Sequence, residues 1–238
     1  MKKNTILGLI TARAGSKRLP GKNSKILGGK PLVQWTIDAC KKSQHISDLV
    51  VSSDDQDLLN LCEKAGCQVP FIRPKNLATD YSTSFDVAEH AILNLKQRYD
   101  WLLLLQPTSP FRTHQDIDSA VEKAITSDCD SLVSISEISP SYYMNLTIGK
   151  DEKLSTVSKL PFKDLNNMRS QDMPKTYAIN GAIYIIKIDF FLKKKIFFDD
   201  NSSYFLMSEK ASVNIDTYHD WIIAESYLAQ NHDKGYLE

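Results

Sequence analysis

This sequence lacks a net charge, a cysteine pattern and any long apolar run, and each absence excludes a class of protein. Lysine plus arginine and aspartate plus glutamate both number 29, so no overall field draws the chain to nucleic acid or to an anionic membrane. The four cysteines form no CxxC pair and no zinc-ligand spacing, which favours unbonded thiols in a reducing compartment. No apolar run approaches the length of a membrane span. We therefore expect a soluble, cytoplasmic protein with no nucleic-acid and no membrane partner.

No internal repeat or low-complexity stretch interrupts the chain, and apolar runs alternate with helical patterns along it. Strands are expected at Ile6–Thr11, Asp48–Ser53, Gln68–Phe71, Trp101–Leu105, Ser131–Ser136, Ala182–Ile188 and Ser212–Ile215. Helices are expected at Leu32–Lys42, Asp57–Ala65, Ser84–Gln97, Thr113–Ser127 and Trp221–Ala229. This order predicts an α/β fold with a mostly parallel sheet and helices on both faces.

The alternation stops between residues 139 and 178, where the sequence is polar and contains no clear crossover helix. Aromatic and apolar side chains are scattered through this segment, which favours a folded lobe over disorder. We interpret residues 1–238 as one domain and residues 139–178 as a lobe inserted into it.

The segment Leu9–Asn23 carries the strongest functional signal, because an apolar strand runs directly into a loop with glycines and four cations. The cations are Arg13, Lys17, Arg18 and Lys22. Such a loop after a first strand is where an α/β fold binds a polyphosphate, although a solvated basic loop is the simpler alternative. Five residues separate Gly15 from Gly21, and Asn23 stands where a P-loop has Ser or Thr. The loop therefore does not match the motif of a P-loop NTPase.

Two further polar segments are expected at the same edge of the sheet. Residues Gln106–Arg112 form a proline-stiffened turn directly after a central strand, where amide and hydroxyl groups can meet a sugar or a base. Nearer the C-terminus, Asn214 and Asp216 face the same side if their segment is a strand. Asp216 can hold a hard cation such as Mg²⁺ and Asn214 can add an amide oxygen, whereas Asp220 is better suited to capping the last helix.

A fourth segment contains Asn180-Gly181, which by itself indicates only a turn before a strand. Taken together and in this order, the four segments resemble the cytidylyltransferases that activate nonulosonic acids, the CMP-N-acylneuraminate synthetase family. The resemblance covers residues 6–221. It implies a Rossmann-like nucleotidyltransferase with a small dimerisation lobe, which joins CMP from CTP to a nine-carbon 2-keto acid sugar with Mg²⁺ and acts as a homodimer.

The resemblance also implies roles for individual residues. The catalytic set would be Arg13, Lys22 and Asp216, with Asp216 and Asn214 at the metal. The nucleotide-binding set would be Arg13, Ser16, Lys17, Lys22, Asn23, Arg73, Ser82 and Ser84. The sugar-binding set would be Gln106, Asn180, Phe197, Phe198 and Arg169.

Three positions depart from the family pattern. Asn214 replaces a frequent aspartate, while Ser170 and Ala178 stand where relatives carry arginines that meet the sugar carboxylate. A less polar diacylamino sugar such as legionaminic acid is therefore the first expectation, with pseudaminic and N-acetylneuraminic acid as alternatives. A 3-deoxy-octulosonate cytidylyltransferase and a catalytically silent CTP-binding protein also remain open.

Overall fold

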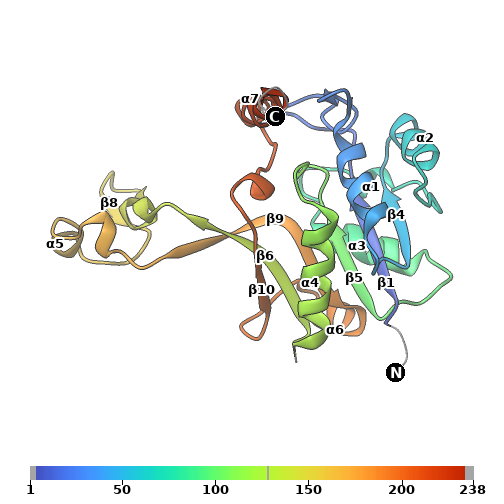
Figure 1. Ribbon diagram of the computed structural model, residues 1–238. Coiled ribbons are helices and arrows are strands. Elements are labelled where there is room, and N and C mark those ends of the chain that lie inside the picture. The colour runs from blue at the N-terminus through green and yellow to red at the C-terminus, as the bar shows by residue number, and fades with distance from the viewer. Residues whose placement is uncertain (1–3, 128, 234–238) are drawn as a thin grey trace.

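A mixed β-sheet forms the centre of this computed structural model, which describes residues 4–127 and 129–233 (Figure 1). Within those residues the sheet has six strands in the order β10-β6-β9-β5-β1-β4. The strands are β1 Ile6–Thr11, β4 Asp48–Ser52, β5 Trp101–Leu105, β6 Ser131–Ile138, β9 Thr176–Lys187 and β10 Ser203–Leu206. All neighbouring pairs are parallel except those that β9 makes with β5 and β6. The predicted α/β fold with a mostly parallel sheet is confirmed.

Helices cover both faces of the sheet. Helices α1 (Leu32–Lys42), α2 (Gln56–Lys64) and α4 (His114–Thr126) pack on one face, while α3 (Ser84–Leu93) and α6 (Ile188–Lys194) pack on the other. The alternation of β1 shows why both faces need cover: Ile6 and Ile10 lie in the first cluster, and Leu7 and Leu9 lie in the second.

The third apolar cluster fixes the C-terminal helix α7 (Tyr218–Asp233) against the first loop of the chain. Trp221 and Ile215 are buried there together with Leu19, which belongs to the basic loop. A small two-stranded sheet, β2 (Ile26–Leu27) with β3 (Lys30–Pro31), follows that loop. This packing places the loop after β1 beside the start of α7.

Two expected strands are not strands. The segment Gln68–Phe71 contributes only an isolated bridge between Gln68 and Val50. The segment Ser212–Ile215 follows a short helix, η4 (Lys210–Ser212), and its alternation reflects the burial of Ile215 in the third cluster. The strand of this region is β10 instead.

Strand β9 is longer than expected, because it begins at Thr176 rather than at Ala182. The pair Asn180-Gly181 lies inside it, at an irregularity where β6 pairs Val133 with Tyr184 but Ile135 with Ile179. Gly181 has a φ of +75° there. The Asn-Gly pair therefore makes a bulge, which uses the same positive φ as a turn.

The predicted ends of two helices also shift. Helix α3 ends at Leu93 rather than at Gln97, and its N-cap is Thr83 in a reciprocal pair with Asp86. Helix α7 begins at Tyr218, ahead of the expected Trp221.

The chain between β6 and β9 projects from the body as a lobe (Figure 1). The elements of the lobe are η2 (Pro140–Met144), β7 (Leu146–Ile148), β8 (Leu154–Thr156), α5 (Phe162–Leu165) and η3 (Ser170–Asp172). Strands β6 and β9 pair out to Ile138 and Thr176 and thus form its stem.

Two negative findings concern the described residues only. Within residues 4–127 and 129–233 no helix combines the length and apolar character needed to cross a membrane. The thiols of Cys40, Cys62, Cys67 and Cys129 are buried and unbonded.

Candidate active site

A cavity of about 470 Å³ lies beyond the carboxyl ends of β1 and β5. This is the edge at which open α/β sheets bind ligands. Among its lining side chains are ten that the sequence singled out: Arg13, Ser16, Lys17, Lys22, Asn23, Arg73, Ser82, Ser84, Gln106 and Asp216. Residues from both ends of the chain thus share one cavity.

The basic loop between β1 and β2 surrounds this cavity with positive charge. Its turn depends on Gly21, with a φ of +65°, whereas Gly15 has open space around it. Asn23 is buried and its Nδ2 donates to the carbonyl oxygen of Arg13 at 3.1 Å, which ties the two ends of the loop together. Asn23 therefore shapes the loop as well as lining the cavity.

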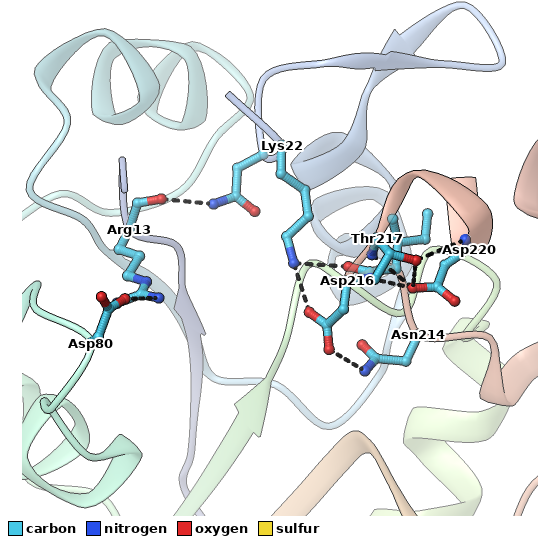
Figure 2. Close-up of polar contacts among 9 residues, drawn as sticks. Arg13, Lys22, Asp80, Asn214, Asp216, Thr217 and Asp220 are labelled. Carbon is cyan, nitrogen blue, oxygen red and sulfur yellow. Dashed lines mark hydrogen bonds and ion pairs between the residues drawn. The ribbon is translucent and has the colours of Figure 1, made fainter. Parts of the chain in front are cut away.

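Asp80 pairs with two of the cations of that loop, and Figure 2 shows the pair with Arg13. Its carboxylate accepts from Arg13 Nη2 at 2.9 Å and forms a second ion pair with Lys17. The hydrogen bond from Lys17 and the one from Arg13 hold the pKa of Asp80 below its usual value. No separate role was predicted for Asp80, because an ion pair across more than sixty residues leaves no spacing signal in the sequence.

Lys22 reaches the opposite wall of the cavity, as Figure 2 shows. Its Nζ donates to Asp216 Oδ1 at 2.9 Å and to the carbonyl oxygen of Ile215 at 2.8 Å. The Lys22 side chain is only 11% exposed, so this contact is partly shielded from water. The expectation that the basic loop and Asp216 meet at one cavity is confirmed.

Asp216 lies in an irregular segment that is fixed at both ends. The backbone N–H of Ile215 donates to the carbonyl of Thr108 at 2.8 Å, which ties it to the turn after β5. Asp220 Oδ2 accepts from the backbone N–H groups of Asp216 and Thr217 at 3.0 and 2.7 Å. Asp220 thus caps α7 together with Thr217, and the same contact holds Asp216 in place.

The groups around Asp216 suit a magnesium ion that is completed by phosphate. Asn214 Nδ2 donates to Asp216 Oδ2 at 3.2 Å, and Asn214 Oδ1 is a buried oxygen with no hydrogen-bond partner in the structure. No group of three or more His, Cys, Asp or Glu side chains that could hold a metal occurs among the described residues. Mg²⁺ commonly takes one or two protein oxygens and fills its shell with phosphate and water, so this donor set fits.

Arg73 lies at the end of β4 and points its buried side chain at the cavity wall. Its Nε donates to Ser52 Oγ at 3.0 Å, and a second hydrogen bond joins Nη2 to the Ser52 carbonyl oxygen. Burial lowers the pKa of Arg73 to about 10, so the guanidinium is charged at neutral pH. It adds a fixed positive charge beneath the cavity.

Helix α3 presents its first turn to the same cavity through Thr83 and Ser84. Ser82 Oγ accepts from the backbone of Thr79 at 3.1 Å and donates to the carbonyl of Asn76 at 3.0 Å. Its hydroxyl therefore holds the loop that carries Asp80. A helix N-terminus facing the cavity adds further N–H groups that favour an anion.

The residues expected at the sugar are not all brought together. Gln106 lines the cavity, and the Asn180 side chain lies behind it, bonded to Ser134 and Ser212. Phe197 packs against Phe191 in the second core cluster. Residues that do not line the cavity are Arg169, on the projecting lobe, Asn180, Phe197, and the exposed Phe198.

A doubly wound sheet with this cationic cavity at its carboxyl edge defines a protein of the nucleotidyltransferase class. The fold is shared with the structure described as CMP:2-keto-3-deoxy-manno-octonic acid synthetase complexed with CTP. The TM-score is 0.71 at 15% identity, and the match covers 95% of this chain and 99% of that one.

The cytidylyltransferase family matches residues 7–217, and the chain belongs to that family. It is 36% identical over 235 residues to the CMP-N,N'-diacetyllegionaminic acid synthase of Legionella pneumophila, covering 96% of this chain and 98% of the relative. It is 31% identical over 237 residues to the pseudaminic acid cytidylyltransferase of Campylobacter jejuni, covering 97% and 99%.

Proposed function

We propose that this protein transfers CMP from CTP to the anomeric hydroxyl of a nonulosonic acid and releases pyrophosphate. The observation that carries the proposal is the contact of Lys22 with Asp216 in a cavity that also holds Arg13 and Arg73. The cavity is lined by five positive side chains, Arg13, Lys17, Arg18, Lys22 and Arg73, and by two acidic ones, Asp80 and Asp216. This excess of positive charge suits a triphosphate, which carries about four negative charges.

Each cation has a distinct task in this proposal. Arg13 and Lys17, on the open side of the cavity, bind the β- and γ-phosphates after these phosphates displace Asp80. Lys22, held against the Ile215 carbonyl, neutralises charge at the α-phosphate. Arg73 and the loop before α3 bind the nucleoside end. Because Lys22 and Arg73 are held by backbone and hydroxyl oxygens before the ligand arrives, they stabilise the transition state without first having to reorganise.

Asp216 and the free oxygen of Asn214 would hold Mg²⁺ at the phosphates. The bound ion supplies charge neutralisation and lowers the pKa of an oxygen that coordinates it. Because Asn214 is neutral, this site places one negative charge fewer at the metal than two carboxylates would.

The reaction balances without a covalent enzyme intermediate. The anomeric oxygen forms a bond to the α-phosphorus, the bond from that phosphorus to the β-phosphate oxygen breaks, and the hydroxyl proton is released. Pyrophosphate leaves with the electron pair, and Arg13 and Lys17 stabilise its charge. The chain's contribution is position and electrostatics.

The proposed acceptor is a legionaminic-type sugar, with pseudaminic and N-acetylneuraminic acid as alternatives. Two relatives that match almost full length are described by legionaminic and pseudaminic acid. Ser170 and Ala178 stand where a more basic pocket would carry arginine, which also favours the less polar sugars. Because CTP is a cytoplasmic nucleotide, we place the reaction in the cytoplasm.

We propose that the lobe pairs two copies of the chain as a homodimer. Its exposed apolar side chains support this, since Ile148 is 75% exposed, Leu154 52% and Phe162 47%. A dimer would also allow Arg169, on the lobe, to approach the cavity of a second copy.

The test is pyrophosphate release by the purified chain with CTP and a panel of acids: N,N'-diacetyllegionaminic, pseudaminic, N-acetylneuraminic and 3-deoxy-octulosonic acid. We expect release only with a nonulosonic acid and Mg²⁺ present together, and the highest kcat/KM with the legionaminic sugar. Release with the octulosonate alone would show the wrong substrate class. CTP binding without release at any Mg²⁺ concentration would show a silent binder.

A further inference from the structure

Arg112 is a buried charge that the proposed chemistry does not use. It is 2% exposed and precedes Thr113, the N-cap of α4. No carboxylate forms an ion pair with it among the described residues. Burial lowers the pKa of Arg112 to about 10, so it is charged at neutral pH.

The guanidinium joins three elements that meet behind the cavity. Its Nη1 donates to the carbonyl oxygens of Ala182 and Gln106 at 2.7 and 3.3 Å. Its Nη2 donates to Thr36 Oγ1 on α1 at 2.7 Å, while Nε is buried without a partner. The guanidinium therefore joins the end of β5 to the bulge of β9.

A buried charge with only neutral partners is a poor way to gain stability. Desolvating an ion costs several kcal/mol, and apolar side chains of similar size often replace buried ions without loss. An arginine at this position is better explained by the two backbone segments that its guanidinium holds in place, the end of β5 and the bulge of β9.

The guanidinium holds in place the part of β9 against which the Gln106 side chain lies. A Cβ at Gly181, the residue before Ala182, would come within 3.3 Å of Gln106 Oε1. Arg112 therefore fixes both the backbone that carries the Gln106 amide and the neighbouring strand on which that amide rests. Gln106 lines the cavity at this end together with Pro107 and Thr108.

We propose that Arg112 is a positioning residue for the acceptor end of the cavity: it orients the Gln106 amide toward the sugar. The inference rests on the proposed function. It predicts an effect that is specific to one substrate, because Arg13, Lys22 and Arg73 bind the nucleotide without contacting Arg112.

The test compares steady-state kinetics of Arg112→Met, Arg112→Lys and the wild type for both substrates. For Arg112→Met we expect the KM for the sugar to rise about tenfold, equivalent to one bidentate contact of ~1.4 kcal/mol, and the KM for CTP to stay within about twofold. Arg112→Lys should fall between, because an ammonium keeps the charge but loses the planar fork.

The matched control is Ile117→Ala, one turn along α4 in the same core. It opens a cavity and lowers Tm but removes no hydrogen bond to Gln106 or Ala182, so both KM values should stay unchanged. Equal changes in the two KM values of the Arg112 variants, or the same split in Ile117→Ala, would overturn the proposal. If Arg112→Met does not fold, Arg112→Lys decides between these outcomes.

A second readout does not depend on turnover. The side-chain NH₂ group of Gln106 should give one pair of proton NMR signals in the wild type, and a shifted or doubled pair in Arg112→Lys. An unchanged signal would contradict the inference. A wild type that turns over no nonulosonic acid would instead refute the proposed function and leave the NMR result to decide the positioning claim.

Discussion

At the scale of single residues, the two cations proposed to bind phosphate already pair with an acid of the same chain. Asp80 uses one carboxylate oxygen for Arg13 and the other for Lys17. In the proposed function, a triphosphate that binds these cations must separate them from Asp80. We therefore expect the carboxylate to lower the affinity for the nucleotide.

Replacing Asp80 with Asn should therefore tighten CTP binding. Exposed ion pairs are weak and screened by salt, so we expect a dissociation constant lowered only about two- to fivefold, and less at high salt. Titration calorimetry at low and high salt measures this change. Asp189→Asn, on α6, removes the same charge elsewhere and should have little effect. Weaker CTP binding by Asp80→Asn would mean that Asp80 contacts the nucleotide.

The sequence placed the cations at the cavity because they directly follow the first strand. Asp216 was predicted from the resemblance and from an expected strand that the structure does not contain. The sequence could not predict the Asp80 pairs or the hydrogen bonds of Arg112, whose partners Thr36 and Ala182 lie about seventy residues away on either side. Such contacts depend on which elements become neighbours, and one sequence does not record that.

At the scale of elements, the bulge of β9 depends on Gly181. Alanine there would have to adopt a φ of +75° and would press on Gln106. We expect Gly181→Ala to cost about 1–2 kcal/mol of stability and to raise the KM for the sugar. Thermal unfolding and kinetics measure the two effects.

Gly29→Ala is the matched control for that substitution. Gly29 has a φ of +85°, but nothing lies within 4 Å of a Cβ placed there. It should lose similar stability and keep the wild-type KM. If both variants change KM alike, the contact with Gln106 is not responsible.

Asp220, at the start of α7, contributes both to the stability of the fold and to the position of Asp216. Asp220→Ala should destabilise the chain by about 1 kcal/mol, the usual worth of a helix cap, and should weaken Mg²⁺ binding because Asp216 loses its backbone partner. Thermal unfolding and metal titration measure these losses. Unchanged Mg²⁺ affinity would show that Asp216 is held by other contacts.

The same variant predicts a pH dependence. Burial raises the pKa of Asp220, but hydrogen bonds from Asp216 and Thr217 outweigh it, and the pKa lies below its usual value. A carboxyl with a lowered folded pKa stabilises the protein above its unfolded pKa, and that contribution is lost as pH falls through the folded value. The stability difference between wild type and Asp220→Ala should thus be full at neutral pH and shrink below about pH 4. A difference that grows in acid would contradict this assignment.

Helices and strands were predicted well where the apolar residues followed a clear period. They were predicted less well where the burial of a single side chain produced an alternation of apolar and polar residues. Trp101–Leu105 and Leu32–Lys42 are observed with the expected bounds. Ser212–Ile215 alternates because Ile215 is buried under α7, and Asn180-Gly181 makes a bulge because β6 continues past it. Both outcomes depend on tertiary neighbours.

At the scale of the whole molecule, the proposed homodimer depends on the lobe. If it pairs two chains, Ile148→Asp should convert a dimer into a monomer, because it places a charge on an exposed apolar strand. Light scattering after size exclusion measures this, with Lys153→Asp in the same lobe as the control. A wild-type monomer, or a dimer unaffected by Ile148→Asp, would exclude pairing through this surface.

The fold brings residues of the first loop and Asp216, nearly two hundred residues later, to one cavity. The resemblance predicted this meeting, and the burial of Leu19, Ile215 and Trp221 in one cluster explains it physically. Which sugar enters the cavity depends on side chains at its acceptor end, and there the sequence offers only departures from a pattern.

The most direct test of the central claim follows the α-phosphate. The protein is incubated with Mg²⁺, N,N'-diacetyllegionaminic acid and CTP that carries oxygen-18 at the non-bridging oxygens of its α-phosphate, and the products are separated and identified by mass spectrometry. We predict that the label appears in a CMP–sugar while unlabelled pyrophosphate accumulates, and that Asp216→Ala and Lys22→Met abolish both. Label that remains in CTP with every nonulosonic acid, although the wild type is folded and binds CTP, would contradict the account.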